Sequence, residues 1–166
     1  RLLYHLTGGD DKQISEWFAS LKESGRYEVT QDVKDKISAL FYAGCCSDDE
    51  TKSAIRRTFE SYSYLLDTHT AVALKVYEDY KRETGDDTKT VIASTANPYK
   101  FSGAVYEALG GKVDTDDEFE IIDRLEKLTS TKMPAPLAAT KDKAVRFTGS
   151  VEKQDMSAVV LDFLKS

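Results

Sequence analysis

The sequence predicts an α/β fold in which helices dominate and strands are few and short. Apolar residues recur at helical spacing along most of the chain, as they do from Ile14 to Leu21. Only two short stretches, Thr90 to Ala93 and Ala144 to Thr148, have the β-branched composition of strands. The 166 residues are 40% hydrophobic and 31% charged, which is typical of one globular domain rather than of a disordered chain.

The first quarter of the chain is predicted to be helical. Arg1 to Leu6 has the pattern of a helix end, and a second helix is expected from Asp10 to Gly25, because acidic residues favour helix starts and glycine favours helix ends. A third helix is expected to start at Thr30 and to have one apolar face, formed by Val33, Ile37, Leu40 and Phe41. Residues 41–46 either continue this third helix or form a short strand.

Two further helices are predicted before the first strand. Ser47 followed by Glu50 is a capping-box pattern, and another helix is expected from Thr68 to Thr84 with Gly85 as its end. The inward residues of these two helices are expected to be Ile55, Phe59 and Tyr62 in the first and Val72, Val76, Tyr77 and Tyr80 in the second.

Residues 90–101 are the most informative stretch. A short strand from Thr90 to Ala93 is expected to pass through a polar turn into a helix that begins at Pro98, since proline suits the first helical position. Ligands bind at the carboxyl ends of strands in open α/β folds. By spacing alone, an ordinary connection between a strand and a helix fits the stretch equally well.

The remainder is predicted to be helix, link and helix. An acidic turn from Asp114 to Glu118 precedes the first helix, Met133 to Leu137 is expected to be a rigid irregular link, and a helix ends the chain. The apolar faces are expected to contain Phe119, Ile122, Leu125 and Leu128 in the first helix and Met156, Val159, Val160 and Phe163 in the last. Few strands beside many helices, and a start at Arg1 rather than Met, suggest part of a longer protein.

Charge and cysteine content exclude several functional classes. The net charge is −6, and Lys or Arg never occur more than two in a row, so neither a nucleic-acid surface nor an anionic-membrane patch is expected. No apolar run approaches the roughly 18 residues of a membrane span. Cys45 and Cys46 are interpreted as small core residues of a cytoplasmic protein, and no metal site is expected because neither His5 nor His69 has a metal-ligand spacing to them.

Six motifs occur in the order found in one enzyme family. They are R-L-L-Y-H-L-T-G-G-D, C-S-D-D-E-T, D-T-H-T-A-V-A, S-T-A-N-P-Y-K-F, M-P-A-P-L and V-R-F-T. Together they resemble the C-terminal part of threonine synthases, over nearly the whole chain. The resemblance implies the helix-rich C-terminal part of a fold type II (tryptophan synthase β-like) enzyme that depends on pyridoxal 5′-phosphate (PLP). It also implies conversion of O-phospho-L-homoserine and water to L-threonine and phosphate.

The resemblance also implies a cofactor-binding group around Thr95, whose hydroxyl would face the pyridine nitrogen of PLP. A hydroxyl donates a hydrogen bond to a neutral ring nitrogen but does not keep it protonated as a carboxylate would, so the ring is a milder electron sink. Ser94 and Asn97 flank it as further cofactor-site residues. On the residues alone, Thr95 could instead cap the helix that follows.

Three more residues are candidates for the substrate site. His69 and Thr70 lie in D-T-H-T-A-V-A, where Thr68 replaces the proline that is usual in the family, and Lys100 is a solvated or phosphate-facing cation. Thr68 removes a rigid turn residue, so the presentation of His69 could differ from that in the family. Lys100 is not the Schiff-base lysine, because the family's lysine lies in an F-K-D motif.

No catalytic residue is expected in this chain. F-K-D and the G-N-F-G type phosphate loop are both absent from the sequence. A missing N-terminal portion of the enzyme would supply both, so the chain alone is expected to be inactive. We expect a helical segment at about 10–46, a cofactor-site α/β segment at about 47–113 and a tail at 114–166. The alternatives are a non-catalytic helical interaction or regulatory module, and a related PLP lyase that acts on another amino acid.

Overall fold

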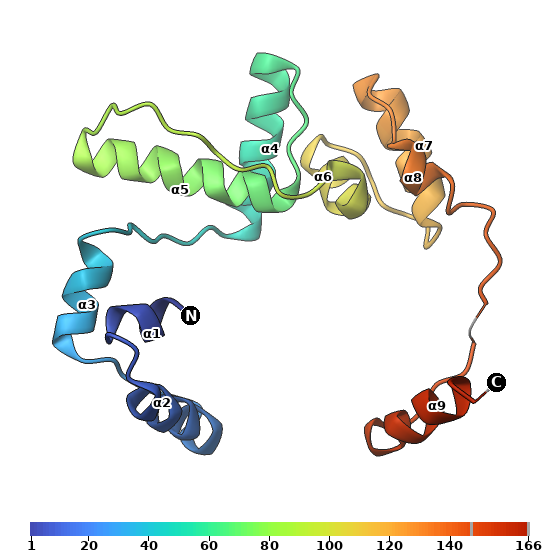
Figure 1. Ribbon diagram of the computed structural model, residues 1–166. Coiled ribbons are helices and arrows are strands. Elements are labelled where there is room, and N and C mark those ends of the chain that lie inside the picture. Colours follow the sequence, from blue (N-terminus) through green and yellow to red (C-terminus); the bar gives the residue numbers. More distant parts are fainter. Residues whose placement is uncertain (147, 166) are drawn as a thin grey trace.

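The computed structural model describes residues 1–146 and 148–165, which form an open arch of helices (Figure 1). The three N-terminal helices, within residues 2–38, and the last helix lie at the two ends of this arch, and the other helices lie between them. The helices are α1 (Leu2–Leu6), α2 (Asp11–Ser24), α3 (Gln31–Ser38), α4 (Asp48–Tyr62), α5 (Thr68–Thr84), the 3₁₀ turn η1 (Pro98–Phe101), α6 (Ser102–Ala108), α7 (Glu118–Thr129), α8 (Ala135–Ala138), η2 (Lys153–Asp155) and α9 (Met156–Phe163). No described helix is long and apolar enough to cross a membrane.

The helix ends follow the capping signals of the sequence. Before α4, the Ser47 hydroxyl accepts from the backbone N–H of Glu50, and the Glu50 carboxylate accepts from the backbone N–H of Ser47, which confirms the predicted capping box. Gly25 and Gly85 end α2 and α5 in the left-handed conformation, with φ of 73° and 71°, where a side chain would be strained. The predicted bounds of α5 are confirmed.

The core lies in the centre of the arch, where α4 packs against α5 and α6, and α6 packs against α7. Ile55 of α4, Val105 of α6 and Leu125 of α7 are fully buried there. The side chain of Arg56 also joins α4 to α6, because its Nε donates to the carbonyl of Ala108 over 2.7 Å. This packing fixes the N-terminal ends of α4 and α5 beside α6.

The prediction of short strands is wrong for the part of the chain that the structure describes. Thr90 to Ala93 is extended but forms no strand, and it belongs to a segment, residues 86–97, that runs back along α5 (Figure 1). β-branched residues favour extended backbone, but a strand also needs a second backbone for its hydrogen bonds. The other predicted strand, Ala144 to Thr148, lies partly outside the described residues, and its described members form no strand.

Several side chains predicted to be buried are exposed instead. Tyr62 is 79% exposed and Leu128 is 47% exposed, although both lie on the predicted inner faces of their helices. Leu40 and Phe41 follow α3 rather than extending it, and residues 41–47 are irregular. Cys45 is exposed, so the pair of cysteines is not a core element. The predicted irregular link at 133–137 contains the short helix α8.

Helix α9 is the clearest case of an apolar element whose large side chains are exposed in the described part of the chain. It forms where the terminal helix was predicted, but it lies apart from the other helices (Figure 1). Its large apolar side chains, Met156, Val159, Val160, Leu161 and Phe163, are all exposed.

The start of the segment 86–97 is held by Asp86, and this contact predicts a pH effect. Hydrogen bonds from Thr88 and from the Tyr80 hydroxyl, which lies 2.6 Å from Asp86 Oδ2, lower the pKa of Asp86 to about 2. A carboxylate whose pKa is lower in the folded state stabilises the fold above its unfolded pKa of about 3.9. This contribution is therefore expected to be lost as the pH falls from about 4 through 2.

Comparing urea unfolding at pH 7 and pH 3 in the Asp86→Asn variant tests this expectation. The variant should show a smaller loss of stability on acidification than the unmodified protein. Asp87→Asn is the matched control, because the Asp87 carboxylate has no hydrogen bond or ion pair within the described chain. An equal acid response in all three proteins would contradict the assignment.

Candidate functional site

The hydroxyl of Thr95 is exposed near the end of the segment 86–97. It makes no hydrogen bond to any residue within 1–146 and 148–165, in contrast to the side chains of Ser94 and Asn97. Ser94 contacts helix α5, and Asn97 caps the turn η1. Thr95 therefore presents an unengaged hydroxyl from a short stretch of backbone that is anchored on both sides.

The N-terminal end of α5 is organised around a buried carboxylate. Asp67 is 1% exposed and is the N-cap of the helix. Its Oδ1 accepts from the backbone N–H groups of His69, over 2.9 Å, and Thr70, over 3.1 Å, and its Oδ2 accepts from the Thr70 hydroxyl. Three donors and the positive end of the helix dipole compensate the burial of its negative charge.

Thr70 connects this carboxylate to the extended segment. It is buried, and its Oγ1 lies 3.3 Å from Oγ of Ser94, which is 24 positions further along the chain. Both residues line a cavity of about 640 Å³ between α4, α5 and the segment 86–97. Ile92 and the ion pair between Arg57 and Glu78 line the same cavity, so its wall combines apolar, hydroxyl and charged side chains.

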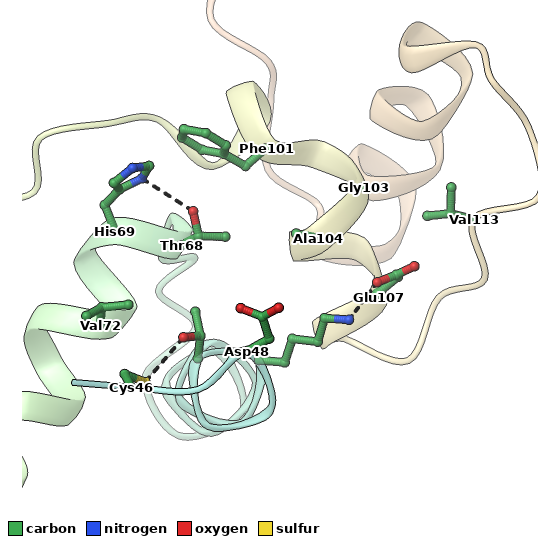
Figure 2. Close-up of a pocket in the computed structure, with 12 residues that line it drawn as sticks. Cys46, Asp48, Thr68, His69, Val72, Phe101, Gly103, Ala104, Glu107 and Val113 are labelled. Atoms are coloured by element: carbon green, nitrogen blue, oxygen red, sulfur yellow. Dashed lines mark hydrogen bonds and ion pairs between the residues drawn. The ribbon is translucent and has the colours of Figure 1, made fainter. Parts of the chain in front are cut away.

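His69 faces a different cavity, of about 600 Å³, which lies between the starts of α4 and α5 and helix α6 (Figure 2). Its ring centroid is 4.9 Å from that of Phe101, and its Nδ1 lies 3.4 Å from the Thr68 hydroxyl. The side chain is 63% exposed. On the opposite wall, Lys52 pairs with Glu107 over 2.7 Å, so the positive charge of this lysine is compensated within the cavity.

Asn97 and Lys100 lie at a third and smaller cavity of about 320 Å³ beside α8. The Asn97 side chain accepts from the backbone N–H of Tyr99 over 3.0 Å, as a cap residue does before Pro98. Lys100 is exposed. Tyr99, between them, is buried, and its hydroxyl is 2.7 Å from that of Thr131.

The six predicted site residues therefore do not line one common cavity. Ser94, Thr95 and Asn97 follow each other on the segment, while His69, Thr70 and Lys100 reach separate cavities. The sequence reasoning missed Asp67, although an acidic residue directly before a helix start is a recognisable N-cap signal. No cluster of His, Cys, Asp or Glu able to hold a metal ion lies within residues 1–146 and 148–165.

The comparisons with known proteins agree with each other. Residues 70–160 match the family model described as "Threonine synthase, C-terminal". Threonine synthase of Saccharomyces cerevisiae is 33% identical over 138 residues, which are 77% of this chain and 27% of the yeast protein. Human threonine synthase-like 1 is 31% identical over 109 residues, which are 66% of this chain and 14% of that protein.

A solved structure is similar in fold as well as in sequence. The crystal structure of PLP-bound threonine synthase from Brucella melitensis superposes with a TM-score of 0.60 and 31% identity, over 80% of this chain and 26% of that protein. The chain thus spans about a quarter of the length of the yeast and Brucella enzymes. The family model covers more than half of the chain, and we conclude that the chain belongs to the threonine synthase family, in its C-terminal region.

Proposed function

We propose that this chain works as the C-terminal part of a PLP-dependent threonine synthase, which converts O-phospho-L-homoserine and water to L-threonine and phosphate. Its support is the match to the C-terminal family model and the similarity to a PLP-bound enzyme. We place the enzyme in the cytoplasm, in keeping with two cysteines that form no disulfide.

The observation that carries the proposal is the unengaged hydroxyl of Thr95. A hydroxyl without a partner among the described residues is free to donate to a ring nitrogen, and the anchored side chains of Ser94 and Asn97 limit its freedom to move. Ser94 and Asn97 would complete this side of the cofactor site, within a cofactor-site segment at about 47–113. When bound, PLP supplies the electron sink for elimination of phosphate and addition of water.

The substrate would be contacted by residues at the start of α5 and of η1. His69 offers an exposed imidazole above Phe101, and Lys100 offers an exposed ammonium group that can attract a phosphate. Thr70 contributes its hydroxyl from the wall of the largest of these cavities. The cofactor lysine and the phosphate loop would come from the rest of the enzyme, since neither F-K-D nor a G-N-F-G type loop occurs in this sequence.

Thr95→Ala in the full-length enzyme tests the proposal. Loss of the hydroxyl should change the absorption spectrum of bound PLP and lower kcat by on the order of 10²-fold, the effect of removing one donor to a charge-developing atom. Thr95→Ser restores the hydroxyl and should retain both properties. Thr90→Ala is the matched control, because Thr90 lies on the same segment and its hydroxyl donates only to the carbonyl of Thr88.

Unchanged spectrum and turnover in Thr95→Ala would contradict the proposal and would favour the non-catalytic interaction module. As a further control, the isolated chain treated with PLP and borohydride should show no stoichiometric labelling of one lysine. Such labelling would show that a cofactor lysine lies within these 166 residues.

A further inference from the structure

The segment that carries Thr95 is extended, yet it has no sheet to hold it. Residues 86–96 make no backbone–backbone hydrogen bond within the part of the chain that the structure describes. Its path therefore depends on side chains. Asp86 holds the start through Tyr80, Ser94 contacts Thr70 of α5, and Asn97 caps η1. The last two anchors lie one residue before Thr95 and two residues after it.

The Thr70 hydroxyl bridges a carboxylate and a second hydroxyl. Its Oγ1 donates to Asp67 Oδ2, since an ionised carboxylate can only accept. The same Oγ1 lies 3.3 Å from Oγ of Ser94, with the geometry of a donor to it. Because Asp67 already accepts two backbone N–H groups at the helix start, its orientation is fixed.

We propose that Asp67, Thr70 and Ser94 form a relay that positions Thr95. Asp67 fixes the position of the Thr70 hydroxyl, this hydroxyl contacts Ser94, and Ser94 holds the extended segment against the start of α5. Successive side chains of an extended segment point to opposite sides. With Ser94 turned toward α5, Thr95 is directed away from it, which is the orientation a ligand on the open side needs. The proposal rests on the proposed role of Thr95 in the cofactor site.

The relay runs from the interior to the surface. Asp67 and Thr70 are both buried, whereas Ser94 is exposed. Three donors satisfy the buried carboxylate of Asp67, so its orientation at the inner end of the relay is fixed. Positioning of Thr95 matters for the rate, because a displacement of about 1 Å at a site can lower a rate by up to 10²-fold.

Thr70→Val and Ser94→Ala in the full-length enzyme test the relay. Valine has the shape of threonine but no hydroxyl, and Ser94 is exposed, so both variants should fold. Each should shift the spectrum of bound PLP in the same direction as Thr95→Ala and lower kcat by about tenfold. Thr70→Ser keeps the hydroxyl and should restore the spectrum. Thr129→Val is the matched control, since Thr129 is a buried helical threonine whose hydroxyl serves only α7 and Thr131.

A double-mutant cycle separates positioning from general loss of stability. If the relay acts through Thr95, adding Thr70→Val to Thr95→Ala should change the spectrum no further. The relay is wrong if Thr95→Ala shifts the spectrum while Thr70→Val and Ser94→Ala leave it as in Thr129→Val. It is also wrong if the effects simply add. If Thr95→Ala itself leaves the spectrum unchanged, the proposed function fails, and the relay fails with it.

Discussion

Leu125→Ala is expected to lower the free energy of unfolding by about 2–5 kcal/mol, the range for truncating a fully buried leucine. Leu125 of α7 is 0% exposed and belongs to the same cluster as Val105 and Ala108 of α6 and Ile55 of α4. Truncation removes apolar contacts within this cluster and leaves a cavity, because close-packed neighbours relax only in part. Urea unfolding followed by far-ultraviolet circular dichroism measures the change.

Leu128→Ala is the matched control for this variant. Leu128 lies one turn further along α7 but is 47% exposed, so its truncation should cost less than about 1 kcal/mol. The slope of the unfolding curve with urea should remain unchanged in both variants, since a changed slope indicates a different native or denatured state. Equal losses in the two variants would place the core elsewhere than between α4, α6 and α7.

The helices could be predicted from the sequence because their determinants are local. Ser47 and Glu50 satisfy each other within one turn, and Gly25 and Gly85 end helices through their own backbone freedom. That Thr90 to Ala93 forms no strand in the described chain could not be predicted. Residue composition is a local property, whereas strand pairing depends on a second, distant stretch of backbone. The described chain provides no second backbone for it.

The inner faces of the helices were predicted less well for the same reason. A periodic apolar stripe shows that a helix has a face to cover, but not where its cover is. Ile55 belongs to the buried cluster with Val105 of α6, whereas Tyr62 on the same helix and Leu161 on α9 are exposed within the described part of the chain. The chain spans about a quarter of its yeast and Brucella relatives, so these faces are candidates for contact with the rest of such an enzyme.

The order of the motifs in the sequence was enough to name candidate site residues, but not to show which of them touch each other. The motif around Thr95 and the motif around His69 could be recognised as they stand in the sequence. The link between them could not be recognised, because Thr70 and Ser94 meet only when the segment 86–97 turns back along α5. The contact between Thr70 and Ser94 links the buried carboxylate of Asp67 to the segment 86–97 through two hydroxyl groups.

Asp67→Ala is expected to lower the free energy of unfolding by about 2–4 kcal/mol, more than the loss of an ordinary cap. Alanine leaves the backbone N–H groups of His69 and Thr70 and the Thr70 hydroxyl without their acceptor. Each buried donor that loses its partner costs about 1–3 kcal/mol, and partial rehydration at the helix start offsets some of this sum. Thermal and urea unfolding of the variant measure the loss.

Asp117→Ala separates the effect of burial from the effect of capping. Asp117 is the N-cap of α7 and accepts from two backbone N–H groups, as Asp67 does for α5, but its carboxylate is exposed. Water replaces its lost contacts, so this variant should lose only about 1 kcal/mol. If both variants lost the same amount, Asp67 would be an ordinary cap. The expected excess in Asp67→Ala reflects the third donor, Thr70, and the absence of water to replace the carboxylate.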